Sequence, residues 1–426
     1  MKKLTWLLPL VVVTIHAHAQ KKEDRRTLGN LQTHVSYLES EQLHSRSTGA
    51  PGEQKAAAYM ASQMQQTGLA PLGDNGFLQT FPVKETREPA AACRLIVNEE
   101  VLLPGKQYVP LPFSAEKSAK GEAIPNVNEP DNIWLINAAE MDAGSGKTMQ
   151  ERYLQQTQVA EKSGASGVVF YNGKETPAEV TKWLDQKPAA AGIPAVWAGS
   201  DISKKLNADD ARGFRVNMQI AFKTVKLTGT NVIGYISNKA PRTIIIGAHY
   251  DYPGWDTAAP SADNACGAAA LLEIARLLKG SRLHNNNYVI IAFSGKEQGL
   301  YGSKYFAAHP GGTDLSQVNY MISLDGIGQQ APGKPIQVGG TNTSPGWAAI
   351  LQQAATKELP LAYDSTGANP ADHTSFYQKN IPVLYFNTGG ADGNKINYEG
   401  TLDVLKLVYN IIDKTSKDKL AFSKAD

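Results

Sequence analysis

Apolar residues in the second half of the chain fall into short runs separated by polar loops. Four runs of five or six residues predict buried strands, at Thr243–Gly247, Tyr288–Phe293, Tyr320–Leu324 and Pro382–Phe386. Between the first two runs, small and apolar side chains at helical spacing predict a helix over Gly267–Leu278. This alternation of strands and helices indicates an α/β fold with a mostly parallel mixed sheet flanked by helices.

Ionisable side chains stand at or beside the ends of these predicted strands. Two imidazoles and three carboxylates make up the set: His249, Asp263, Glu297, Asp325 and His373. In a parallel sheet the carboxyl ends of the strands share one edge, and ligands bind there. One such residue alone is more often a cap or a hydrogen-bonded polar group than a metal ligand. Five together favour one or two zinc-like ions, which take imidazole nitrogen and carboxylate oxygen.

Several motifs around these residues carry a resemblance to a known family. They are HYD at 249–251, DNACG at 263–267, GKEQGLYGS at 295–303, the LD of MISLDGIG, and ADHTSFYQKNIPVLYF at 371–386. Together they resemble the di-zinc aminopeptidases, family twenty-eight of the metallopeptidases, which includes bacterial leucyl aminopeptidases and glutamate carboxypeptidase II. The resemblance implies a zinc-exopeptidase-like fold, a peptide substrate and two divalent metal ions, expected to be zinc.

The same resemblance implies how the five ligands divide between the two ions. Asp263 would be the bridging ligand that both ions share. His249 and Asp325 would complete the site of one ion, and Glu297 and His373 would complete the site of the other.

Two residues beside the ligands have implied roles of their own. Asp251 would be the carboxylate that orients the His249 imidazole, which metal-binding histidines usually require. Lys296 stands where the family has an acidic general base, because its motif has two consecutive acidic residues and this chain has Lys296-Glu297. An ammonium cannot take the proton of an attacking water, a transfer that contributes about a hundred- to ten-thousand-fold in rate.

The substitution at Lys296 leaves several alternatives open. The site could bind metals without turnover, or burial beside metal ions could keep the lysine neutral so that it acts as a base. The ammonium could instead occupy the space of one ion or of both. Finally, Lys296 could turn outward to solvent, with the base absent or supplied by Asp251, Asp256 or Glu273.

A second departure from the family pattern lies at Gly389–Asn394, where a histidine-containing loop of the family is short and its histidine is missing. The substrate preference therefore stays open. The sequence favours an exported metal-dependent aminopeptidase. The alternative is a catalytically impaired relative that binds peptides or a partner through the same cleft. Chemistry like that of the glutaminyl cyclase relatives is disfavoured, because those keep an acidic base and use fewer metal ligands.

The N-terminus has the pattern of a secretory signal peptide over residues 1–19. Two lysines precede an apolar stretch at Leu7–Ile15, and the small-residue sequence Ala17-His18-Ala19 follows it. No other apolar stretch is long enough to cross a bilayer. The mature chain is therefore expected in the periplasm or outside the cell.

The remaining chain is expected to form two domains. Residues 20–84 and 226–426 would make the metallopeptidase-like domain, and residues 85–225 an inserted β-rich domain. Within the insertion, GASGVVFYN and GIPAVWAGSDISKKL resemble the protease-associated domain, although a plain accessory domain fits equally well. The expected strands of the insertion include Arg215–Phe222.

The charge balance and the cysteines give further expectations about partners and disulfides. Lysine and arginine number 42 against 40 aspartates and glutamates, so nothing in the charge balance favours a nucleic-acid partner. The two cysteines, Cys93 and Cys266, lie in different predicted domains, and buried free thiols are expected rather than a disulfide.

Overall fold

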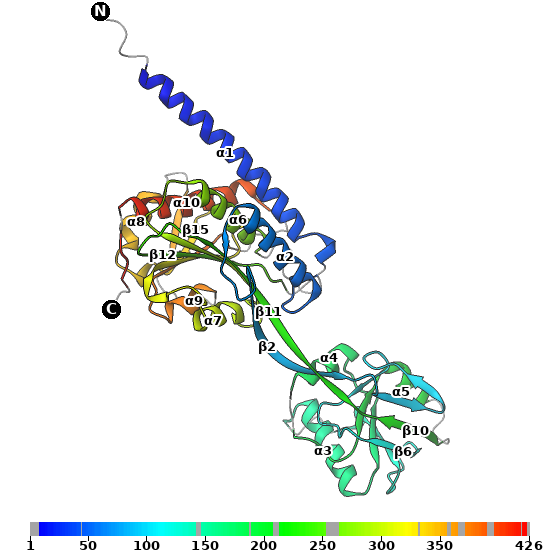
Figure 1. The fold of residues 1–426 in the computed structure, drawn as a ribbon. Helices are drawn as coiled ribbons and strands as arrows, with labels where there is room; N and C mark the ends of the chain where they lie inside the picture. Colours follow the sequence, from blue (N-terminus) through cyan, green and yellow to red (C-terminus); the bar gives the residue numbers. More distant parts are fainter. Residues whose placement is uncertain are drawn as a thin grey trace, which may run out of the picture. The chain divides into compact units, whose positions relative to one another are not determined.

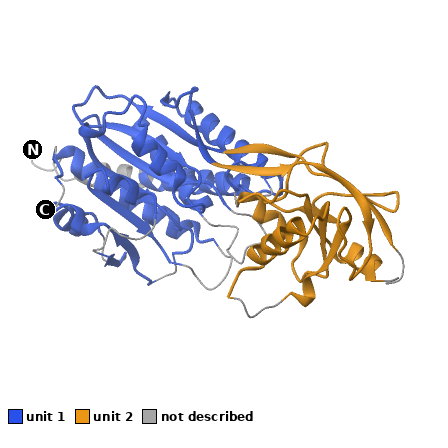
Figure 2. Cartoon of the chain, turned by 90° about the horizontal axis from the view of Figure 1, so that it is seen from below, with its two compact units in different colours: residues 1–83, 228–426 blue, residues 84–227 orange. Residues whose placement is uncertain are grey.

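A computed structural model of the chain forms two compact units (Figure 2). Unit 1 comprises Met1–Val83 and Thr228–Asp426, and unit 2 comprises Lys84–Leu227. The structure describes residues 8–43, 45–141, 146–186, 189–207, 213–252, 264–330, 333–355, 359–364, 371–389, 396–418 and 420–423.

Unit 1 is built on one mixed sheet (Figure 1). Its strands lie in the order β1 (Ala70–Pro71), β11 (Phe222–Ile236), β13 (Asn287–Phe293), β12 (Thr243–His249), β14 (Val318–Leu324), β17 (Val383–Asn387), β15 (Ile336–Gly339) and β16 (Leu361–Asp364). The four central strands β13, β12, β14 and β17 are parallel to one another. Antiparallel pairs join β11 to β13 and β15 to β17. The predicted mostly parallel mixed sheet is confirmed.

Helices cover both faces of this sheet (Figure 1). One face packs against α1 (Leu8–Leu38), α2 (Pro51–Gln66), α6 (Ala265–Gly280), α8 (Trp347–Ala354) and α10 (Tyr398–Lys417). The other face packs against α7 (Tyr301–Ala308) and α9 (His373–Tyr377). Successive residues of a strand point to opposite faces, so Ile244 and Ile246 enter the first layer and Ile245 the second. Burial on both sides explains why the central strands are continuous apolar runs.

Unit 2 contains two smaller sheets. The first is antiparallel, in the order β4 (Glu100–Leu102), β3 (Arg94–Val97), β10 (Phe214–Gln219) and β6 (Ser118–Ala123). The second has the order β5 (Tyr108–Pro110), β9 (Ala195–Ala198), β8 (Gly167–Tyr171) and β7 (Ile133–Asn137). The α-helices of unit 2 are α3 (Met149–Lys162), α4 (Pro177–Lys182) and α5 (Ser200–Asn207). The resemblance of this unit to a protease-associated domain stays a prediction.

The predicted strand Arg215–Phe222 is wrong as a single element. The structure ends β10 at Gln219 and starts β11 at Phe222. Strand β11 then pairs with β2 (Leu78–Pro89), and each of these two strands contributes residues to both units. The sequence shows one apolar stretch here because β10 and β11 follow each other after only two residues.

The N-terminal helix α1 begins at Leu8 and so includes residues of the predicted signal peptide. Farther along, Leu31, Val35 and Leu38 are buried in the core of unit 1, which makes this part of α1 integral to the fold. Among the described residues, no helix is long and apolar enough to span a membrane. The expectation of buried free thiols at Cys93 and Cys266 is confirmed.

Candidate metal centre

The ends of the central strands bring the predicted ligands to one edge of the sheet. His249 is the last residue of β12 and pairs with Phe293, the last residue of β13. On the other side of β12, Ala248 pairs with Leu324, the last residue of β14. The segments that carry Lys296, Glu297 and Asp325 therefore leave the sheet beside His249.

The His249 imidazole lies between two carboxylates and is fully buried. Its Nδ1 is 3.3 Å from Oδ1 of Asp251, and its Nε2 is 3.2 Å from Oδ1 of Asp325. This is the geometry that the predicted orienting role of Asp251 requires, because Nε2 is left to face the other ligand. Burial alone would lower the pKa of His249, but hydrogen bonds and charges of the two carboxylates raise it well above its ordinary value.

Asp251 also ties the end of β12 to neighbouring segments. Its Oδ2 accepts hydrogen bonds from the hydroxyl of Thr48 at 3.4 Å and from the backbone N–H of Glu297 at 3.3 Å. The carboxylate that orients His249 is thereby held in place, and it fixes the backbone that carries Glu297.

Lys296 turns inward, toward the predicted ligands. Its Nζ donates a hydrogen bond to Oε1 of Glu297 at 2.7 Å and lies 3.8 Å from Oδ1 of Asp325. The side chain is 18% exposed, so the alternative in which Lys296 points to solvent is wrong. Burial would raise the pKa of Asp325, but the hydrogen bond and charge of His249, with the charge of Lys296, hold it below its ordinary value.

The last predicted ligand, His373, is the first residue of α9 and is fully buried. Its ring lies 4.9 Å from the ring of Tyr385 on β17, centroid to centroid, and its charge contributes to the lowered pKa of Asp325. Beside it, Asp372 is 2% exposed, and burial raises its pKa to about 7. Sequence analysis missed Asp372 as a member of this cluster, because only the tertiary fold shows that it is buried.

Asn264 is a second residue that the sequence analysis missed. It is buried in the left-handed region with φ of 48°, a conformation that asparagine tolerates. Its Nδ2 donates to the backbone oxygens of His249 and Leu324, each at 3.0 Å, and its Oδ1 accepts from the N–H of Gly326 at 3.1 Å. Asn264 therefore joins the ends of β12 and β14, directly after Asp263 in the chain.

Part of the predicted site lies outside the described residues. These are the predicted bridging ligand Asp263, the alternative base Asp256, and residues 390–394 of the shortened loop. Within the residues that the structure describes, no three His, Cys, Asp or Glu side chains form a group that could hold a metal ion.

The spacing of the two described ligands is nevertheless compatible with zinc. Two ligands of a tetrahedral zinc ion, each about 2.1 Å from the metal, lie about 3.4 Å apart. Nε2 of His249 and Oδ1 of Asp325 are separated by 3.2 Å. Both side chains are buried, so they suit an ion that binds imidazole nitrogen and carboxylate oxygen away from bulk water.

Comparison with known proteins gives a match to a peptidase family. Residues 231–418 match peptidase family M28. The match covers less than half of the chain and shows that this part is similar to that family. The match confirms the resemblance found in the sequence motifs, and it covers all five predicted ligands.

Relatives extend over most of the chain. Aminopeptidase YwaD of Bacillus subtilis is 26% identical over 410 residues, which are 92% of this chain and 84% of that protein. An aminopeptidase structure from Aneurinibacillus sp. strain AM-1 matches with a TM-score of 0.50 at 21% identity, over 95% of this chain and 96% of that one. A zinc aminopeptidase structure from Bacillus subtilis matches with a TM-score of 0.51 at 21% identity, over 91% and 95%. The two structures show that the fold is shared.

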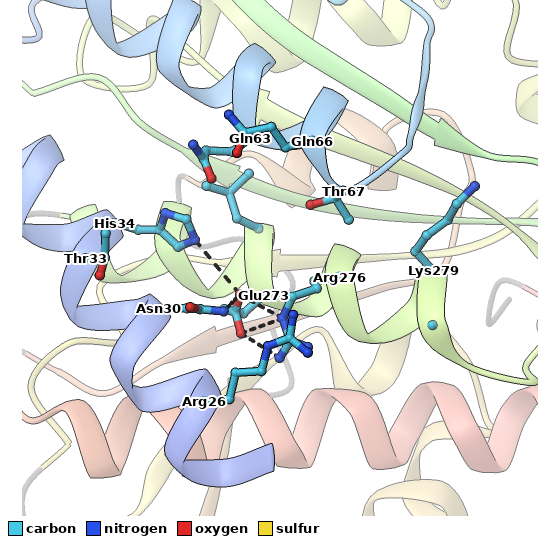
Figure 3. Close-up of a pocket in the computed structure, with 12 residues that line it drawn as sticks. Arg26, Asn30, Thr33, His34, Gln63, Gln66, Thr67, Glu273, Arg276 and Lys279 are labelled. Carbon is cyan, nitrogen blue, oxygen red and sulfur yellow. Dashed lines mark hydrogen bonds and ion pairs between the residues drawn. The ribbon is translucent and has the colours of Figure 1, made fainter. Parts of the chain in front are cut away.

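A separate polar hollow of about 530 Å³ lies between α1, α2 and α6 (Figure 3). At its floor, the buried Glu273 accepts a hydrogen bond from Asn30 at 2.9 Å and two from Nε of Arg276 at 3.0 Å. Asn30 is on α1, whereas Glu273 and Arg276 are on α6, so the hollow's buried charges hold these two helices together. Glu273 is engaged there, and the alternative in which it serves as the base at Lys296 is wrong.

Replacing Glu273 by alanine should destabilise unit 1 by roughly 2–4 kcal/mol, because the half-buried Arg276 loses its main partner. Urea unfolding measures this change. Lys279→Gln is the matched control, since Lys279 lines the same hollow but is exposed, and its substitution should stay within about 0.5 kcal/mol of wild type. Equal stability of Glu273→Ala and the control would contradict the helix-clamping role.

Replacing Asp251 by alanine should weaken zinc binding by about 10- to 100-fold, because the His249 imidazole loses the carboxylate that orients it. Competition with a chromogenic chelator measures the affinity. Asp413→Ala is a suitable control, because Asp413 pairs with Lys417 on α10 rather than with a residue of the centre. Wild-type affinity in Asp251→Ala would show that Asp251 has no orienting role.

Proposed function

We propose that the chain is an exported zinc-dependent aminopeptidase that removes N-terminal residues from peptides. The observation that carries the proposal is the buried His249, oriented by Asp251 on one side and facing Asp325 on the other, at the carboxyl edge of the sheet. The match of residues 231–418 to peptidase family M28 supports a peptide substrate. The aminopeptidase and zinc aminopeptidase names of the relatives support the reaction and the metal.

The resemblance assigns five residues to the metal: His249, Asp263, Glu297, Asp325 and His373. If all five were used, they would give three ligands to each of two ions, with Asp263 shared. Bound zinc lowers the pKa of a water molecule to about 7 and polarises a carbonyl group, which is the chemistry that peptide hydrolysis needs.

Three other residues of the centre hold the ligands in position or add charge beside them. Asp251 holds the imidazole of His249 with Nε2 toward Asp325. Asn264 holds the backbone at the ends of β12 and β14. Lys296 brings a positive charge to the ligands, and such a charge stabilises an oxyanion that develops on the peptide carbonyl.

The alternative of a non-catalytic peptide-binding protein gains no support from the relatives, whose names describe enzymes. The described contacts also leave His249 and Asp325 in a geometry suited to metal binding. We therefore carry the peptidase forward as the function.

Removal of zinc should abolish hydrolysis of aminoacyl p-nitroanilides, and added zinc should restore it, because the peptide carbonyl is activated only at the metal. His249→Ala should lose both bound zinc and activity. His284→Ala, at an exposed histidine, should keep both. Full hydrolysis by chelator-treated protein, with no zinc detected, would contradict the proposed function.

Export gives a separate test of the signal-peptide prediction. The exported protein should begin at Gln20, because the predicted signal peptide ends at Ala19. Mass spectrometry of protein recovered from the periplasm or the medium measures this N-terminus. Recovery of the uncleaved chain from the cytoplasm alone would overturn the proposed export.

A further inference from the structure

The backbone at Lys296 forms a hydrogen-bonded turn. The carbonyl of Lys296 accepts hydrogen bonds from the N–H groups of Gly299 and Leu300, both at 3.1 Å. Gly295, just before it, has φ of 75°, in the region that favours glycine, and its carbonyl accepts from the N–H of Tyr301 at 3.0 Å. The backbone that carries Lys296 is therefore fixed at the edge of the metal centre.

The Lys296 side chain lies close to two carboxylates, and the predicted ligand set assigns these to different metal ions. Glu297 is assigned to one ion, and its Oε1 is 2.7 Å from Nζ of Lys296. Asp325 is assigned to the other ion, and its Oδ1 is 3.8 Å from the same nitrogen. The ammonium thus lies between predicted ligands of two different ions and is paired more closely with Glu297.

We propose that the ammonium of Lys296 takes the place of one of the two divalent ions. The wild-type centre then binds a single zinc ion tightly, with His249 and Asp325 as its described ligands. Glu297 is neutralised by Lys296 in place of a metal. This inference rests on the proposed function, because it takes zinc as the ion that the centre binds.

Coulomb repulsion determines how strongly the Lys296 charge weakens binding of a second zinc ion. A unit positive charge and a divalent ion about 4 Å apart repel each other twice as strongly as two unit charges do. Even with the screening of bulk water, this repulsion weakens binding of the ion by about thirtyfold, and the lower effective dielectric of a buried site makes the loss larger. A second zinc on Glu297 would also have to break the 2.7 Å ion pair with Lys296.

The remaining ion keeps its site because its ligands are arranged independently of Lys296. Asp251 orients His249, and Asp325 lies 3.2 Å from its Nε2. Asn264 joins the strand ends that carry these two ligands. Nζ of Lys296 lies 3.8 Å from Asp325 and 2.7 Å from Glu297. The ammonium therefore weakens zinc binding less at His249 and Asp325 than at Glu297.

The test is zinc binding by the full mature chain, with zinc ions alone as the probe. Metal content after gel filtration and titration calorimetry together give the stoichiometry and both affinities. Wild type should hold one zinc ion. Lys296→Gln should hold two, with the affinity for the second raised at least about thirtyfold. Lys296→Arg, which keeps the charge, should hold one.

A control separates the loss of this charge from general effects. Lys304→Gln removes the same charge from an exposed lysine on α7 and should leave one zinc ion bound. The stoichiometry of the wild type provides a test that does not depend on the folding of Lys296→Gln.

The outcomes separate this inference from the proposed function. Two tightly bound zinc ions in wild type, or a single ion in folded Lys296→Gln, would each overturn the role of Lys296. No zinc in wild type or in any variant would instead overturn the proposed zinc dependence.

Discussion

Burying several carboxylates together at one edge of a sheet is unfavourable unless cations lie beside them. Asp251, Asp325 and Asp372 are all nearly inaccessible to solvent. In the described structure, the His249 imidazole lies against Asp251 and Asp325, and Lys296 supplies a positive charge near Asp325. Cations beside these buried carboxylates are therefore favoured, and the ammonium of Lys296 is one such cation.

The fold brings these buried carboxylates together and holds them in place. Parallel pairing of β12 with β13 and β14 places the strand ends side by side, so residues distant in sequence share one edge. The segment after the strand end is held from outside the sheet. Arg46 donates through Nε to the carbonyl of Tyr250 at 2.7 Å, and Thr48 donates to Asp251. These contacts fix the geometry around His249 before any ligand arrives, which is the preorganisation that a metal centre needs.

The sequence was sufficient to predict the strands and the residue types at their ends, because buried parallel strands leave continuous apolar runs. It placed the end of the first strand two residues early, at Gly247 rather than His249, since apolar periodicity fades where a strand meets polar ligands. It could not show which way Lys296 points. It also missed Asn264 and Asp372, whose roles depend on contacts with distant segments. Asp263, the predicted bridging ligand, lies outside the described residues and stays a prediction.

Lys296 is the residue on which the account of this centre turns, because it converts an acidic position into a positive one beside the ligands. The most direct measurement is anomalous diffraction at the zinc edge from crystals of the zinc-loaded wild-type protein. The account predicts one strong zinc peak about 2.0–2.2 Å from Nε2 of His249 and from a carboxylate oxygen of Asp325, with Lys296 still paired to Glu297. Two fully occupied zinc peaks, one of them bound to Glu297 with Lys296 displaced, would contradict it.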